Sequence, residues 1–138
     1  MLASIDVILR LFISVIVGLL VGFARRKKAA GMRTFALFCL GCTIFTIISI
    51  DDIFGPTADK TRIIAQVVTG IGFLGLGVIW KQGTHPTGLT TAAAIWVTAA
   101  IGILIGLAMW SEAAISTVLT LAIVYSKPML RKTGLEDY

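Results

Sequence analysis

Long apolar runs separated by short polar or basic stretches dominate the hydrophobic pattern of this chain. A helix rises about 1.5 Å per residue, so about 20 apolar residues cross a hydrocarbon core of about 30 Å. Runs close to this length predict spans at residues 5–23, 34–50, 62–80, 88–109 and 112–126. The sequence therefore predicts an all-α fold, a polytopic membrane bundle of about five helices in a single domain over residues 1–138.

Composition also indicates a membrane protein, and it reduces the number of functions to be considered. Hydrophobic residues make up 57% of the chain and charged residues 14%, and the mean hydropathy is +0.97. Soluble domains carry about 25% charged residues. The polar loops hold no nucleophile, base and orienting group in a catalytic arrangement, so we expect no enzymatic activity and no cofactor. The chain has a net charge of +5, and its basic residues lie at helix ends rather than on one continuous face. This distribution argues against a nucleic-acid partner and is typical of a protein embedded in a lipid bilayer.

The distribution of basic residues predicts the orientation. Arg25, Arg26, Lys27, Lys28 and Arg33 separate the first two spans, with no acid among them. Cytoplasmic loops carry an excess of Lys and Arg, so this loop is expected inside, the N-terminus outside and the C-terminus inside. We expect a multi-pass protein of the plasma membrane.

The third span is unusually rich in glycine, with Gly70, Gly72, Gly75 and Gly77 within eight residues. Glycine costs about 1 kcal/mol relative to alanine inside a helix, so four of them need a reason. Close helix packing is the reason we favour, because small residues let membrane helices approach each other. The alternative is a partly unwound helix whose backbone groups line an ion or substrate site, together with Gln66 and Thr69.

Small residues also recur at intervals of four in the first and fourth spans, which predicts two packing seams. We expect the fourth span to form a tight pair with the third, and the bulky ring of Trp96, which lies off the seam, to pack inside the bundle. The residues assigned to helix packing are Ser14, Gly18, Gly22, Gly70, Gly72, Gly75, Gly77, Thr98, Gly102 and Gly106, with Thr90 and Ala94 on the second seam.

Charged residues near the outer ends of two spans predict local pairs. Asp6 and Arg10 lie one helical turn apart, so we expect an ion pair, with Arg10 extending toward the membrane surface. Asp59 precedes the third span and is a candidate N-cap and a partner for Arg62. Gln66 follows one turn later, inside the membrane, where a polar residue is a functional candidate.

Metal-binding residues are sparse. Cys39 and Cys42 lack a second cysteine pair, so we interpret them as small apolar side chains in the helix core. His85 is the single histidine and is expected in solvent. Mg²⁺ prefers carboxylates and water, and most acids lie at the predicted outer face, so the sequence leaves a metal site open.

Three segments carry a resemblance to a known family: Gly31-Met32-Arg33-Thr34, the residues from Asp59 to Gly75, and Gly88-Leu89-Thr90-Thr91-Ala92-Ala93 with Trp96 and Gly102. In order and spacing they resemble the MgtC/SapB family of bacterial inner-membrane proteins. The polar candidates for function are Arg33, Thr34, Asp59, Arg62, Gln66, Thr69, Thr90 and Thr91.

The resemblance implies a five-span hydrophobic domain and a role in growth under magnesium limitation. It also implies a role in the survival of pathogens inside macrophages. Some members of the family are said to restrain the F-type ATP synthase. Two departures affect the transfer of these roles. Many relatives end the first span with Gly-x-Glu-Arg, whereas this chain reads Gly22-Phe23-Ala24-Arg25 and lacks the acid. The C-terminal ACT-like domain of some relatives is expected to be absent.

Two functional hypotheses follow. In the first, a non-enzymatic regulatory protein packs against another membrane protein and contributes to adaptation to low magnesium. In the second, a small transporter or ion-binding protein for Mg²⁺ or another cation uses the third span as its site. Five spans in 138 residues leave much surface in lipid, which also predicts a homo-oligomer.

Overall fold

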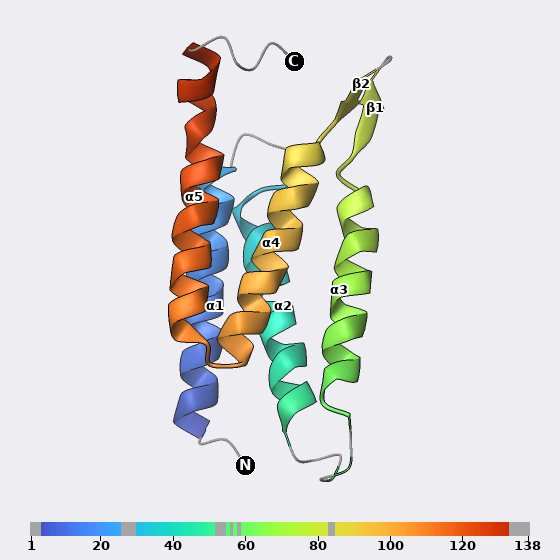
Figure 1. The fold of residues 1–138 in the computed structure, drawn as a ribbon, viewed down its shortest axis with the longest axis vertical. Helices are drawn as coiled ribbons and strands as arrows, with labels where there is room; N and C mark the ends of the chain where they lie inside the picture. The colour runs from blue at the N-terminus through green and yellow to red at the C-terminus, as the bar shows by residue number, and fades with distance from the viewer. Residues whose placement is uncertain are drawn as a thin grey trace.

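The computed structural model describes residues 4–25, 30–51, 55, 57, 59–82 and 85–132 of the chain. Five helices and one short hairpin follow each other along the sequence (Figure 1). They are α1 (Ser4–Ala24), α2 (Met32–Ile50), α3 (Thr61–Leu76), β1 (Trp80–Gln82), β2 (His85–Thr87), α4 (Leu89–Gly106) and α5 (Trp110–Lys132).

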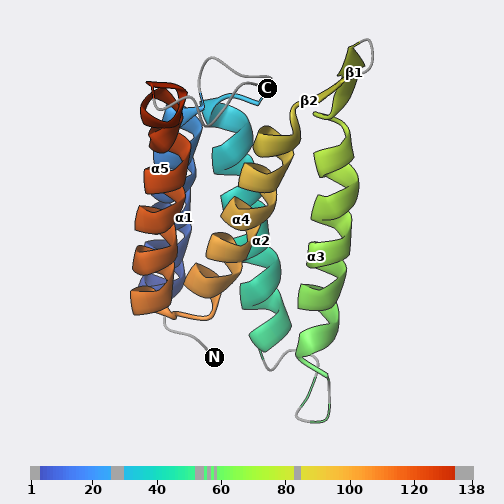
Figure 2. The same cartoon turned by 45° about the horizontal axis from the view of Figure 1, so that its top comes forward.

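Successive helices run in opposite directions, which places the two termini at opposite ends of the bundle (Figure 1, Figure 2). Three helices, α1, α2 and α4, are long and apolar enough to cross a membrane. The apolar stretches of α3 and of residues 110–126 are shorter. This architecture confirms the predicted all-α membrane bundle. Which end faces the cytoplasm stays a prediction.

Helix α4 lies at the centre of the bundle and contacts each of the other four helices. Helix α2 contacts α1, α3 and α4. Helix α3 is at the rim, packing mainly on α2 and α4 (Figure 1). Only Ile71 and Gly75 of α3 are buried, so most of this helix is exposed.

Both small-residue seams face α2. A Cβ atom built on Gly18 would lie 2.5 Å from the Cα of Ala36, far inside contact distance. A Cβ on Gly102 would lie 2.5 Å from the carbonyl oxygen of Cys39, and one on Gly106 equally close to Thr46. We expected the seam of α4 to pack tightly on the third span, and this prediction is wrong, because the seam packs on α2. Helix α4 does contact α3, but its glycines are used against α2.

The apolar core is formed where α1, α2 and α4 meet. Phe35, Ile95 and Ile101 are completely buried there. Cys39 and Cys42 are buried free thiols, which confirms their interpretation as core side chains. Trp96 does not pack inside as expected, because its ring lies on the outer face of α4 and is 53% exposed. A bilayer-facing aromatic is stable since lipid is as apolar as the core.

The third span is shorter than predicted and the fifth is longer. Helix α3 ends at Leu76 because Gly77, Val78 and Ile79 form a tight turn of hydrogen bonds to residues three positions earlier. The chain then forms the antiparallel hairpin, in which Trp80 pairs with Thr87 and Gln82 with His85. Gly88 follows with a φ of 89°, where a Cβ would collide with the backbone of Val78, so glycine is required there.

Candidate functional site

Among the residues whose burial the structure describes, two arginines are buried in the apolar bundle. Arg10 in the second turn of α1 is 5% exposed, and Arg25, directly after α1, is 6% exposed. A charge taken out of water is costly unless it is paired and hydrogen-bonded. Neither arginine is among the predicted site residues. The sequence did contain a signal for Arg10, because it is an isolated cation inside a predicted span. A charged residue at such a position is a functional candidate by default.

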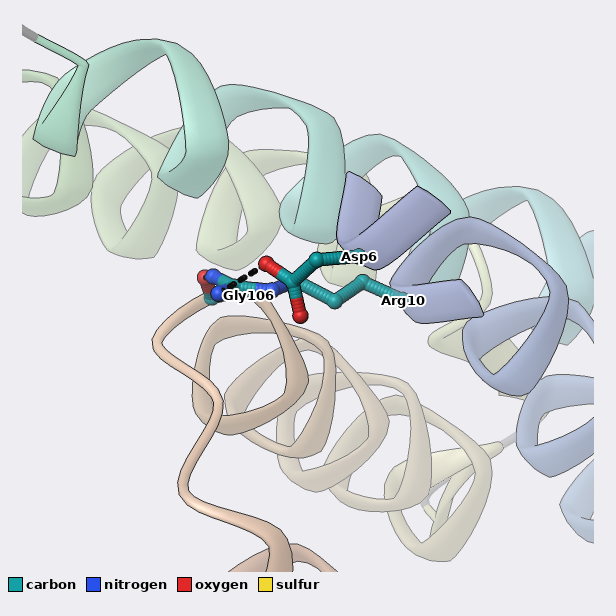
Figure 3. Close-up of polar contacts among 3 residues, drawn as sticks. All are labelled: Asp6, Arg10 and Gly106. Atoms are coloured by element: carbon teal, nitrogen blue, oxygen red, sulfur yellow. Dashed lines mark hydrogen bonds and ion pairs between the residues drawn. The ribbon is translucent and has the colours of Figure 1, made fainter. Parts of the chain in front are cut away.

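Arg10 joins α1 to the end of α4. Its guanidinium makes an ion pair with Asp6, with 2.5 Å between Nη2 and Oδ2, and its Nη1 donates a hydrogen bond of 2.5 Å to the carbonyl oxygen of Gly106 (Figure 3). The pair with Asp6 is confirmed, but Arg10 points into the bundle rather than toward the membrane surface. Gly106 is the last residue of α4, where unpaired carbonyls carry partial negative charge. Arg10 therefore caps this helix.

Arg25 lies at the opposite end of α1, beside the start of α4. Its Nη2 donates a hydrogen bond of 2.5 Å to Oγ of Thr91, which is 2% exposed in the first turn of α4. Its Nε has no acceptor. Burial lowers the pKa of the Arg25 guanidinium below its ordinary value. Among the residues that the structure describes, no carboxylate lies within 4 Å of this cation.

The predicted polar candidates divide between the two ends of the bundle. Arg33 and Thr34 lie in the first turn of α2, and Thr90 and Thr91 in the first turn of α4, at the same end as Arg25 (Figure 1). Of these, only Thr91 is buried. Sequence spacing did not indicate that Arg25 and Thr91 meet, because 66 positions separate them.

Asp59 and Arg62 lie at the other end, before and in the first turn of α3. The Asp59 carboxylate accepts hydrogen bonds from the hydroxyl and the backbone amide of Thr61, at 2.6 and 2.9 Å, which lowers the pKa of Asp59. The residue at the N-cap position is Lys60 rather than Asp59. The contacts described for these side chains include no Asp59–Arg62 ion pair within 4 Å, but the positive charge of Arg62 contributes to lowering the pKa of Asp59. Two hydrogen bonds to Thr61 hold the carboxylate instead.

The outer face of α3 carries the other candidates. Gln66, Thr69, Gly70 and Gly72 are exposed, and a Cβ on either glycine would meet nothing within 4 Å. A Cβ on Gly75 would meet only the Cβ of Ala92, at 3.9 Å. Helix α3 continues through these glycines, so the chain does not unwind there into a coordination site. Within this protomer the glycines of α3 make no close helix contact.

A groove between α2 and α3 has a volume of about 620 Å³. Its lining is almost entirely apolar, with Gln66 and Thr34 as polar members. Among the residues with a described position, no group of three or more His, Cys, Asp or Glu could hold a metal ion. The residues that line the groove are Thr34, Leu37, Phe38, Gly41, Cys42, Phe45, Ile63, Gln66, Val67, Gly70, Ile71 and Leu74.

Comparison with known proteins assigns the family. The sequence model of the MgtC family matches residues 11–133. The chain belongs to the MgtC family. It is 42% identical over 110 residues to Protein MgtC of Brucella abortus (strain 2308), covering 78% of this chain and 45% of that protein. It is 41% identical over 116 residues to Protein MgtC of Salmonella typhimurium (strain 14028s / SGSC 2262), covering 83% of this chain and 49% of that protein.

The chain therefore spans about half the length of the curated relatives it matches. No solved structure matches it. Family membership and the apolar helices identify a membrane protein of the MgtC type.

Proposed function

We propose that this protein is a non-enzymatic regulatory protein of the bacterial inner membrane, which acts by packing α3 against a helix of another membrane protein. The observation that carries the proposal is the run of Gln66, Thr69 and Gly72 on α3, three exposed residues that follow each other at intervals of about one helical turn. Its contribution to adaptation to low magnesium rests on the family resemblance alone.

The physical argument starts from what lipid can solvate. A glutamine side chain that faces hydrocarbon leaves its amide donors and acceptor without partners, which costs free energy. Gly72, one turn after Thr69, allows another backbone to approach closely, and polar side chains can then hydrogen-bond across the interface. A partner helix on α3 satisfies both requirements.

The other small-residue surfaces are already occupied inside the protomer. Gly18 and Gly22 contact α2 from one side, and Gly102 and Gly106 contact it from the other. The seams that the sequence suggested for partner binding therefore stabilise the chain itself. Of the helices described, α3 is the one with two exposed glycines, Gly70 and Gly72.

Photo-crosslinking in native membranes tests the proposal. A crosslinking residue at Thr69 is expected to capture a membrane protein, and Gly72→Leu in the same chain is expected to abolish capture, because leucine prevents close approach. Ala122→Leu, at an exposed position on α5, is the matched control and should retain capture. Crosslinks to lipid alone, or capture unchanged by Gly72→Leu, would contradict the proposal. Capture of a second copy would replace the heterologous partner by self-association.

Transport is the competing function, favoured by the position of Gln66 in the groove between α2 and α3. Mg²⁺ flux into liposomes carrying the purified protein distinguishes the two. We expect no flux above that of empty vesicles from protein shown to be folded. Saturable flux that Gln66→Leu or Asp59→Asn abolishes would overturn the regulatory proposal.

A further inference from the structure

Arg25 is a buried cation placed beside the positive end of a helix. Its side chain is 6% exposed, and its Nη2 contacts Oγ of Thr91 in the first turn of α4. The first backbone amides of a helix lack intrahelical acceptors and carry about half a positive charge. The guanidinium and the helix end therefore repel each other.

Nothing in the described part of the chain offsets this repulsion. The ion pair within residues 4–25 belongs to Arg10 and Asp6, at the other end of the bundle. The residue at the α4 N-cap position is Gly88, which has no side chain to accept from the helix. The amides of Thr91 and Ala92 bond to the carbonyl of Gly88.

An unmet hydrogen-bond donor and the positive end of a helix thus lie close together. The donor is the Nε of Arg25, which is buried and has no acceptor among the described residues, and the helix end is the first turn of α4, which Nη2 of Arg25 reaches through Thr91. Thr91 orients the guanidinium toward the helix end, since its hydroxyl oxygen accepts from Nη2. Donors that converge in a dehydrated setting, with positive charge on both sides, fit an anion.

We propose that Arg25, Thr91 and the first turn of α4 form a binding site for a phosphate group. Guanidinium donors match the oxygen geometry of phosphate, and helix N-termini bind it through their amides. The phosphate belongs either to the headgroup of an anionic lipid or to inorganic phosphate.

The position of the site is suited to both sources. The three long apolar helices α1, α2 and α4 have one of their ends here, so the site lies where the hydrocarbon region gives way to headgroups and water. Arg25 follows the last residue of α1, and Thr91 is in the first turn of α4. The end of α1 and the start of α4 lie at the same end of the bundle (Figure 2). A lipid phosphate reaches this depth from the bilayer, and inorganic phosphate reaches it from the aqueous side.

Binding can be measured as a shift in thermal unfolding of the full chain in a neutral detergent. Phosphatidylglycerol is titrated against diacylglycerol with the same acyl chains, and sodium phosphate against sodium chloride at equal ionic strength. We expect stabilisation by phosphatidylglycerol, by phosphate, or by both, and none by diacylglycerol or chloride. Phosphatidylglycerol alone identifies a lipid headgroup, and phosphate alone identifies the free ion. Stabilisation by neither overturns the proposal.

Variants test whether the named residues form the site. Arg25→Gln is expected to weaken binding by about tenfold or more, because it removes charge-assisted hydrogen bonds. Arg33→Gln removes the same charge at an exposed position and should change affinity by less than about twofold. Equal binding by Arg25→Gln and the native chain would overturn the proposal.

Two milder variants decide the question if Arg25→Gln does not fold. Arg25→Lys keeps the charge but loses the planar fork, and Thr91→Val keeps the volume but no longer orients the guanidinium. Each is expected to weaken binding by at least about threefold. Native affinity in both would overturn the site.

Discussion

Arg10 in α1 and Gly106 at the end of α4 are joined by a hydrogen bond of 2.5 Å from the guanidinium to the carbonyl oxygen. The bond connects residues 96 positions apart. It places a cation at the negative end of α4, where the helix dipole favours it. Arg25 has the reverse relationship to the same helix, as a cation at its positive end. Both arginines have a buried Nε without a described partner, but Arg10 is compensated by Asp6 and by a helix C-terminus, whereas Arg25 faces a helix N-terminus.

Removing the Arg10 cap should destabilise the bundle. Arg10→Leu is expected to lower the free energy of unfolding by about 2–3 kcal/mol, as the loss of charge-assisted hydrogen bonds predicts. The loss should be smaller than for a fully buried pair because Asp6 is one-third exposed and can reach water. Unfolding in mixed micelles measures it. Arg62→Leu, at an exposed arginine, is the control, and an equal loss in both variants would refute the capping role.

Glycines of the inner seams and of α3 should respond in opposite ways to alanine. Gly102→Ala places a Cβ against the carbonyl of Cys39, and we expect a loss of about 1–3 kcal/mol through overpacking. Gly72→Ala meets open space and should stabilise α3 by up to about 1 kcal/mol through helix propensity. Thermal unfolding of the two variants in the same detergent provides the comparison. Destabilisation by Gly72→Ala would indicate that its face is covered in the assembled protein.

Thr43 should stabilise the contact between α2 and α4. Its hydroxyl lies 2.8 Å from the carbonyl oxygen of Gly102 on α4 and 3.0 Å from that of Cys39 on its own helix. Thr43→Val is expected to cost about 0.6–1.7 kcal/mol, the range for interhelical hydrogen bonds in membranes.

Thr98→Val is the matched control for Thr43→Val. Thr98 is equally buried, but its hydroxyl donates only to Ala94 on its own helix. We therefore expect the smaller loss from this variant. The reverse order, measured by unfolding in mixed micelles, would assign the stability to local rather than interhelical bonding.

Asp59 should make the start of α3 sensitive to acid. Hydrogen bonds from Thr61 hold the pKa of Asp59 below its ordinary value of about 3.9. Because the folded-state pKa is the lower one, the stabilisation is present above the unfolded value and is lost as the pH falls through the folded value. An NMR titration of the carboxyl group measures the pKa. Thr61→Val should raise it toward the ordinary value, and an unchanged pKa would contradict this assignment.

The local sequence pattern was sufficient to predict the helices and the contacts within a single helix. Apolar runs of membrane length predicted the bundle, and the four-residue spacing of Asp6 and Arg10 predicted their ion pair. These features depend on residues within one or two turns, so sequence spacing determines them. The end of α3 was less predictable, because the turn at Gly77 lies inside an apolar run with no polar signal to mark it.

The tertiary structure decided which faces meet. Seams in α1 and α4 could have served a partner, and the structure shows both against α2, while Gly70 and Gly72 of α3 are exposed. It also brought Arg25 to Thr91 across 66 positions. In a soluble protein the apolar side of a helix indicates its buried face, but lipid is as apolar as a protein core. Hydrophobicity along this chain therefore determined that it forms the apolar helix bundle of a membrane protein, and only close packing and buried polar contacts selected the neighbours of each helix.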